Sequence, residues 1–328
     1  MNYQVLGPAQ PARQDSNGVY WQLYNVQYPD GRTGQLDFYY NGTQWVEGTP
    51  AQPQAAAPTS KISLLKKAPQ TAGVVSLTKN YESLETTLVN LSKSSGINLS
   101  KHTARVAVCL DYSGSMAPMY RSGEVQEVLQ RLFPIALQFD DDGQLEVWAF
   151  ESGFTRLEPM TLNNFETYVK SEVIPNCRYG GTSYAPALQD ILQKHFSEEP
   201  AQIPTFVIFI TDGANSDRRQ TDQVIRQSSA MKIFIQFVGI GPVDDFDYLM
   251  KLDDLDGRQC DNTGFIRVKD MLGIPADKLY NCLLEQYIPW LSVAPKMASV
   301  MPAAPMSQSV QSNPAQQAAP RKKKWGIF

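Results

Sequence analysis

Three short polar segments carry closely spaced hydroxyl and carboxyl groups. They read DYSGS at 111–115, RYGGTSYAP at 178–186 and TDGANSD at 211–217. Side chains that offer only oxygen suit a hard cation, and the glycines beside them permit tight backbone turns. The candidate ligands are Asp111, Ser113, Ser115, Thr182 and Asp212. Together the segments predict a site for one divalent cation, Mg²⁺ or Mn²⁺.

The elements that must position these side chains follow from the hydrophobic pattern after Thr103. Four apolar runs, ARVAVCL, LEVWAF, TFVIFI and KIFIQFVGI, are typical of strands buried on both faces. Amphipathic segments between them predict helices, the first with a kink at Pro134. The expected helices are 123–139, 162–172, 184–196 and 219–230. This alternation predicts a doubly wound α/β domain with a mainly parallel sheet over 103–291.

The polar segments occupy the positions where such folds bind ligands. In an open α/β sheet, ligands lie beyond the carboxyl ends of the strands. DYSGS directly follows ARVAVCL, and TDGANSD directly follows TFVIFI. The glycine-rich turn follows the helix expected at 162–172. We therefore expect the three segments to meet at one edge of the sheet.

The order DxSxS, GGT and TDG resembles the metal-ion-dependent adhesion site (MIDAS) of von Willebrand factor A (vWA) domains, with all five positions filled. The resemblance implies that Ser113 and Ser115 bind the metal directly. Asp111, Thr182 and Asp212 would bind it directly or through water. Neutral hydroxyl ligands leave the cation electron-poor, so it attracts an outside anionic oxygen, typically an Asp or Glu of a protein partner. The implied function is metal-dependent partner binding.

A longer stretch, VSLTKNYESLETTLVNLSKSSGINLSKHTARVAVCLDYSGSM, is similar to the TerF-type branch of tellurite-resistance proteins. The similarity covers roughly 61–291. In the TerD-like fragment 61–102, recurring VSLTK, VNLSK and INLSK predict short strands. This fragment is too short for a full TerD-like sandwich and lacks its acidic calcium-binding clusters. The resemblance implies a bacterial or phage protein of the cytoplasm, acting in tellurite resistance or chemical stress.

The remaining segments differ in composition from the α/β domain. Residues 1–18 are polar and expected to be flexible, and 48–60 form a Pro/Ala/Gln linker. Within 19–47, the turn dipeptides Asp30-Gly31 and Asn41-Gly42 predict a three-stranded antiparallel module. Its aromatic residues form either its core or a peptide-binding face. Residues 292–328 read as a disordered tail.

The tail ends in RKKKWGIF, a basic run followed by large apolar residues. Trp325 and Phe328 are candidate partner-binding residues. The pattern suits a hydrophobic groove with an acidic rim on another protein, and also an anionic membrane surface. A solubilising tail with no binding role is the third interpretation. Protein docking is favoured because four charges and one short apolar tip give only marginal membrane affinity.

Composition excludes several other classes of function. A net charge of −4 argues against general nucleic-acid binding. The longest apolar runs are far below the roughly 20 residues that span a bilayer. The N-terminal MNYQVLGPAQ lacks the features of a signal peptide, which favours the cytoplasm. The four cysteines match no zinc-ligand spacing and are expected to be reduced. The oligomeric state is left open.

Two alternatives remain beside partner binding. A metal-dependent hydrolase or phosphatase would need a general base, yet His102 and His195 are the only histidines, and neither is near Ser113 in sequence. No GxSxG, P-loop or second cluster of carboxylates is present, so an enzyme is not expected. The other alternative is a scaffold whose metal is purely structural. Metal removal separates the two, because only a structural site loses the fold.

Overall fold

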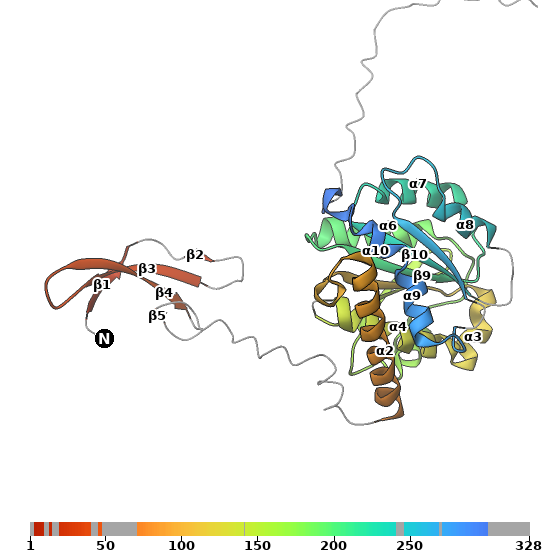
Figure 1. The fold of residues 1–328 in the computed structure, drawn as a ribbon, viewed down its shortest axis with the longest axis horizontal. Helices are drawn as coiled ribbons and strands as arrows, with labels where there is room; N and C mark the ends of the chain where they lie inside the picture. Colours follow the sequence, from red (N-terminus) through yellow and green to blue (C-terminus); the bar gives the residue numbers. More distant parts are fainter. Residues whose placement is uncertain are drawn as a thin grey trace, which may run out of the picture. The chain divides into compact units, whose positions relative to one another are not determined.

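The protein forms two compact units, 1–82 and 83–328, and its chain is drawn in Figure 1. The computed structural model describes residues 3–9, 13–14, 20–40, 45–47, 71–140, 142–240, 246–268 and 271–300. The predicted linker 48–60 lies outside them. So do 301–328, with the candidate residues Trp325 and Phe328. Among the described residues, no helix is both long enough and apolar enough to cross a membrane.

The N-terminal unit contains an antiparallel sheet, as its turn dipeptides predict, but one that is larger than expected. Its strands are β1 (Gln4–Pro8), β2 (Arg13–Gln14), β3 (Tyr20–Gln27), β4 (Thr33–Tyr40) and β5 (Trp45–Glu47). They lie in the order β1-β3-β4-β5, and β2 also pairs with β3. The prediction that all of 1–18 is flexible is therefore wrong, because β1 bonds to β3 along a register from Gln4↔Gln27 to Pro8↔Tyr24.

The segment 72–95, predicted as short strands, is a single helix. This helix, α2 (Ala72–Ser95), spans 24 residues. Val74, Leu77, Tyr81, Leu84 and Leu88 are all buried, at alternating intervals of three and four residues that place them on one helical face. The VxLxK fragments alternate only locally, whereas the helical period runs through the whole segment. The strand prediction is wrong for this reason.

The larger unit is built on a six-stranded sheet of mainly parallel strands. The strands are β6 (Arg105–Asp111), β7 (Leu145–Phe150), β8 (Phe154–Met160), β9 (Thr205–Thr211), β10 (Ile233–Ile240) and β11 (Thr263–Val268). Their order is β11-β10-β9-β6-β7-β8, and only the pairing of β7 with β8 is antiparallel. All four predicted strands are confirmed, and the doubly wound α/β fold with them.

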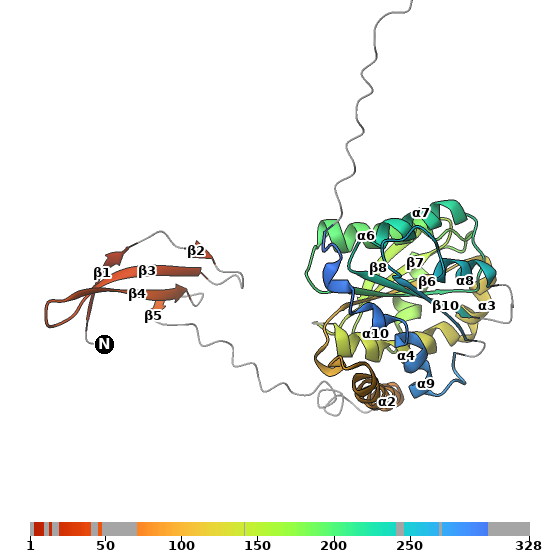
Figure 2. The same cartoon turned by 45° about the horizontal axis from the view of Figure 1, so that its top comes forward.

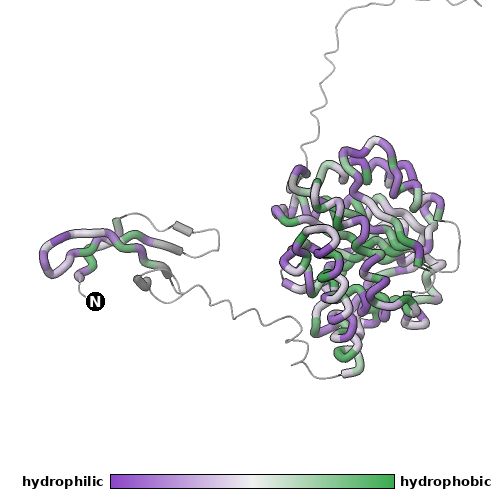
Figure 3. Tube along the Cα trace, in the orientation of Figure 1, coloured by the Kyte–Doolittle hydropathy of each residue, from purple (hydrophilic) through white to green (hydrophobic). Residues whose placement is uncertain are grey.

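Helices cover both faces of this sheet. The longer ones are α4 (Glu124–Phe139), α6 (Ala185–Gln193), α7 (Arg218–Ser228), α8 (Asp247–Asp253) and α9 (Ala276–Leu284). In Figure 2, α6, α7 and α8 lie on one face, and α4 and α9 lie on the other with the end of α2. Pro134 lies inside α4, which continues through it. In Figure 3, hydrophobic residues run through the centre of the unit, and hydrophilic residues gather around α7.

The remaining helical segments are short. They are η1 (Leu99–Lys101), η2 (Gly114–Met116), α3 (Ala117–Ser122), η3 (Val169–Val173), α5 (Ile174–Asn176), η4 (Lys194–Glu198), α10 (Tyr287–Trp290) and η5 (Ala294–Lys296). The helix predicted at 162–172 is displaced to 169–176. Its expected start is a turn instead, in which the Asn164 side chain accepts a hydrogen bond from the Thr161 backbone N–H at 2.7 Å.

Residues 292–300 belong to the folded unit, which corrects the predicted start of the tail. The backbone N–H of Lys232 donates to the carbonyl of Ala298 at 2.8 Å, and the N–H of Ala298 donates to Ala230 at 2.9 Å. These bonds hold the segment beside the beginning of β10. Composition alone did not predict this, because the anchoring is by backbone groups that every residue carries.

Candidate metal centre

The two candidate carboxylates lie side by side because their strands are neighbours. Asp111 ends β6, and Asp212 directly follows β9. These strands are parallel, with Leu110 opposite Ile210. The ends of β6, β9 and β10 therefore form one rim, here called the carboxyl edge, and the opposite rim is the amino edge. The expected meeting of DYSGS and TDGANSD at this edge is confirmed by the topology.

Asp111 is fully buried and held by two hydrogen bonds. Its Oδ1 accepts from the backbone N–H of Ser113 at 2.8 Å. Its Oδ2 accepts from the hydroxyl of Thr211 at 2.7 Å. Burial raises the pKa of Asp111 to about 6; the two hydrogen bonds oppose this rise and the charge of Asp212 adds to it. The two hydrogen bonds thus fix the orientation of the carboxylate, while burial and the charge of Asp212 disfavour its ionised form.

The two serines of DYSGS bring their hydroxyls together. Ser113 Oγ lies 3.0 Å from Ser115 Oγ. Ser113 is buried and Ser115 exposed, so the pair reaches from the interior to the surface. The tight turn η2 at Gly114–Met116 makes this approach possible. The spacing in DxSxS therefore places both hydroxyls beside one point, as the cation site requires.

The glycine-rich turn carries Thr182 to the same edge. Ser113 forms an isolated parallel bridge with Gly180, and the N–H of Gly114 donates to the Gly180 carbonyl at 3.2 Å. Thr182 follows two residues later and is buried. The structure therefore gathers all five candidate ligands, from three segments, at the carboxyl edge. Their roles as metal ligands stay a prediction.

Three supporting residues were missed from the sequence. The carbonyl of Thr182 accepts from Ser216 Oγ at 2.7 Å and from its backbone N–H at 2.8 Å. Asp217 accepts from the N–H groups of Tyr184 and Ala185, at 3.0 and 2.9 Å, where α6 begins. With Thr211, these residues tie the loops together. Thr211, Ser216 and Asp217 all lie within TDGANSD, so the motif itself held the signal.

The charge of the site fits a cation. Asp212 Oδ1 is buried and has no hydrogen-bond partner among the described residues. Across the same residues, no Lys, Arg or His forms an ion pair with Asp111 or Asp212. Nor do three His, Cys, Asp or Glu side chains gather anywhere in this part of the chain. Any cation held here would thus depend on hydroxyl ligands, which serine and threonine supply.

Comparison with known proteins shows the family of this chain. The family model vWA-TerF-like, described as "vWA found in TerF C terminus", matches residues 103–300. The chain belongs to the vWA-TerF-like family. A curated relative, the uncharacterized protein YcbR of Bacillus subtilis (strain 168), is 40% identical over 213 residues. That alignment covers 64% of this chain and 86% of YcbR.

Solved structures match part of this chain at lower sequence identity. The ArnB paralog VWA2 from Sulfolobus acidocaldarius is 18% identical, with a TM-score of 0.37 over 57% of this chain and 46% of its own. Manganese-loaded TRAP protein from Plasmodium vivax is 16% identical, with a TM-score of 0.41 over 57% of this chain and 74% of its own. This chain thus matches less than half the length of the archaeal protein.

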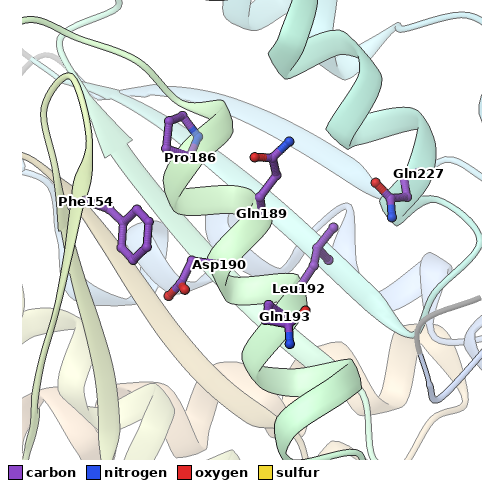
Figure 4. A pocket seen from close by; sticks show the side chains of 7 residues that line it. All are labelled: Phe154, Pro186, Gln189, Asp190, Leu192, Gln193 and Gln227. Carbon is purple, nitrogen blue, oxygen red and sulfur yellow. The ribbon is translucent and has the colours of Figure 1, made fainter. Parts of the chain in front are cut away.

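A surface groove elsewhere on the vWA-TerF-like domain has different chemistry. Its volume is about 460 Å³, and it runs along α6 (Figure 4). Its lining is Phe154, Pro186, Gln189, Asp190, Leu192, Gln193 and Gln227. Asp190, its one ionisable lining group, is bound by Trp148 Nε1 and by the guanidinium of Arg156. The groove thus offers amides and apolar carbon, with no free acid or base for catalysis.

Both histidines of the chain lie far from the carboxyl edge. His102 precedes β6, whose seven residues separate it from Asp111 by roughly 20 Å. Its Nε2 contacts the Tyr287 hydroxyl at 2.7 Å, and burial lowers its pKa to about 4. His195 is fully buried beside Glu146, near the start of β7. Burial lowers the pKa of His195 as well. Neither can serve as a base for Ser113.

Proposed function

We propose that this chain binds a protein partner through a divalent cation held at the carboxyl edge. The observation that carries the proposal is the buried, unpartnered Oδ1 of Asp212 beside the buried carboxylate of Asp111. A buried carboxylate oxygen without a partner is costly, and a bound cation removes that cost. The oxygen-only ligand set favours Mg²⁺, with Mn²⁺ as the second candidate.

Each residue has a distinct part in the proposed site. The hydroxyls of Ser113, Ser115 and Thr182 and the carboxylates of Asp111 and Asp212 would hold the cation. Thr211 fixes Asp111 in orientation, and Ser216 fixes the loop of Thr182. When bound, the cation supplies a positive charge that is only partly neutralised, which attracts an Asp or Glu of the partner.

Binding fits this site better than catalysis does. Hydrolysis at the metal would need a general base within hydrogen-bond reach of the reacting group. His102 and His195 both lie toward the amino edge, and His195 is paired with Glu146. The carboxylates that are present already have positions as ligands. We therefore propose that the chain binds a partner and does not catalyse a reaction.

The cellular setting belongs to the same proposal. The description of the matched family model places this vWA domain in the C terminus of TerF. That description supports a role in tellurite resistance or chemical stress. The relative in Bacillus subtilis supports a bacterial setting. Action in the cytoplasm stays part of the proposal. Docking of Trp325 and Phe328 to a protein stays a prediction, since both lie beyond the described residues.

Calorimetric titration with Mg²⁺ tests the site. Asp212→Asn keeps the shape of the side chain and removes its charge, so Mg²⁺ affinity should fall at least about tenfold. Without metal, the variant should be as stable as the wild type or more so, because two neighbouring carboxylates no longer repel. Glu158→Gln, an exposed carboxylate on β8, is the matched control and should bind Mg²⁺ normally.

Calorimetry, metal removal by EDTA and a pull-down together separate the alternatives. Unchanged Mg²⁺ affinity in Asp212→Asn would remove the proposed site. Unfolding of the wild type by EDTA would identify a structural metal. Retained fold, with loss of a partner from a host-cell pull-down only when EDTA is present, is the result expected for metal-dependent binding.

A further inference from the structure

Three tyrosines form a cluster that is joined to the metal loops. Tyr112 lies between the candidate ligands Asp111 and Ser113, and its ring stacks on Tyr179 at 4.3 Å with an interplanar angle of 5°. Tyr120 meets Tyr112 edge-on at 4.6 Å. The hydroxyl of Tyr120 donates to the backbone carbonyl of Asp111 at 2.9 Å. The cluster is thereby fixed to the same strand end as the candidate ligands.

Tyr179 presents the exposed surface of this cluster. Its exposed fraction is 44%, whereas Tyr112 and Tyr120 are buried. One face of the Tyr179 ring lies on Tyr112, so the exposed area belongs to its opposite face and edges. The next residue, Gly180, is bridged to Ser113. An exposed aromatic ring in a surface loop normally moves freely, but here stacking and the bridge hold it in place.

A fixed, exposed tyrosine beside a charged anchor has the properties of an interface hot spot. Aromatic rings contribute large contact area at low conformational cost, and rigidity before binding reduces that cost further. Gly180, the residue after Tyr179, is bridged to the candidate ligand Ser113, so the Tyr179 ring belongs to a loop that directly adjoins the metal loops. An extended peptide places residues two positions apart on the same face, roughly 6–7 Å from each other, so one peptide can present an acidic and a second side chain to the same surface.

Charge decides which side chain the ring accepts. A tyrosine face can take either a cation or another aromatic ring. Arg178, exposed in the same loop, and the proposed metal both repel a cationic side chain. Glu151 also lies beside Gly180, but its carboxylate already accepts hydrogen bonds from two backbone N–H groups of its own turn. An aromatic side chain experiences no such repulsion. It gains the stacking contact and the burial of apolar area.

We infer that Tyr179, stacked on Tyr112, forms an aromatic subsite beside the metal, and that the partner presents an acidic residue with an aromatic residue one or two positions away. This inference rests on the proposed function, because the acidic residue is the one that the metal captures. The metal supplies the attachment, and Tyr179 selects among acidic segments.

The test uses defined peptides and the full chain with saturating Mg²⁺. The probes are acetyl-Asp-Trp-amide, acetyl-Asp-Gly-Trp-amide, acetyl-Asp-Gly-Arg-amide and acetyl-Asp-Gly-Gly-amide, titrated by calorimetry or NMR. At least one tryptophan peptide should bind about three- to tenfold tighter than the glycine peptide. Tyr179→Ala should abolish that preference, and Tyr179→Phe should keep it.

Controls separate the subsite from the metal. Tyr179→Ala should leave Mg²⁺ affinity and glycine-peptide affinity unchanged. Leu162→Ala removes another exposed apolar side chain, 39% exposed, and should change no peptide affinity. Leu162 follows the end of β8, which runs antiparallel to β7 and so ends at the amino edge.

The outcomes are distinct. Equal, Mg²⁺-dependent binding of the tryptophan and glycine peptides would overturn the aromatic subsite and leave carboxylate capture intact. An arginine peptide that bound as tightly as the tryptophan peptides would overturn the charge argument and the inference with it. Absence of binding by all four peptides, with Mg²⁺ bound normally, would overturn the proposed function and the subsite together.

Discussion

The carboxylates Glu146, Asp111 and Asp212 at the two edges of the central sheet differ in their charged neighbours. At the amino edge, Glu146 lies 3.0 Å from Lys194 Nζ and 2.9 Å from His195 Nε2. At the carboxyl edge, Asp111 and Asp212 are neighbours, and no basic side chain in the described part of the chain pairs with either. The Glu146 carboxylate is thus balanced by groups of the fold itself. An unbalanced pair instead indicates a position for a charge from outside.

Loss of the Thr211 hydroxyl should produce the largest effect, and only at the carboxyl edge. Thr211→Val keeps the shape of this fully buried side chain but removes the donor to Asp111 Oδ2. Groups that orient metal ligands typically contribute 10- to 100-fold in affinity, so Mg²⁺ binding should weaken by about tenfold or more. Calorimetric titration measures this. An unchanged affinity would show that Asp111 needs no orienting partner.

Loss of the Glu146 charge should act in the opposite way, on stability and not on metal binding. In Glu146→Gln, Lys194 and His195 lose the carboxylate that faces them. The free energy of unfolding should fall by about 1–3 kcal/mol, as for other partly buried charged contacts. Urea denaturation with EDTA present gives this value. A matching loss of Mg²⁺ affinity would contradict the separation of the two edges.

The smallest effect concerns pH and again belongs to the amino edge. Burial lowers the pKa of His102 to about 4, below its ordinary value of 6.5, so the folded state favours the neutral ring. The unfolded chain binds the proton more readily between these values. The contribution of the neutral His102 ring to the free energy of unfolding is therefore fully present above about pH 6.5 and is lost as the pH falls toward 4.

The variant His102→Gln isolates this contribution, because glutamine can still contact the Tyr287 hydroxyl and does not titrate. Between pH 7 and pH 5, wild-type protein should lose on the order of 1–2 kcal/mol more unfolding free energy than the variant. Urea denaturation at the two pH values, with EDTA throughout, makes the comparison. Equal losses would mean that His102 does not titrate between folded and unfolded states.

The sequence predicted the carboxyl edge more completely than any other region. Strands buried on both faces have unbroken apolar runs, so these runs alone predict β6, β7, β9 and β10. The motifs follow those runs directly, and the parallel topology then brings them together. Thr211, Ser216 and Asp217 act through hydrogen bonds to segments far away in the sequence, and the tertiary fold decides which segments meet.

Other elements could not be predicted because their patterns are local or weak. In α2, VSLTK and VNLSK suggest alternation, yet Val75 and Val89 are 39% and 45% exposed and the buried residues follow the helical period. Strand β8 has mostly exposed or half-buried residues, so it lacks an apolar run. Its existence depends on pairing with β7, which no single segment encodes.

The character of β8 also limits how this protein can associate with other chains. It is the outermost strand beside β7, and a bare outer strand invites a second chain to extend the sheet by backbone pairing. Arg156 and Glu158 are exposed along β8, and Pro159 lacks an N–H to donate. The charged side chains and the proline oppose pairing of β8 with a strand of another chain, so this outer strand is protected against fibril growth. Even in concentrated solution, copies of this protein should therefore not associate by pairing their β8 strands.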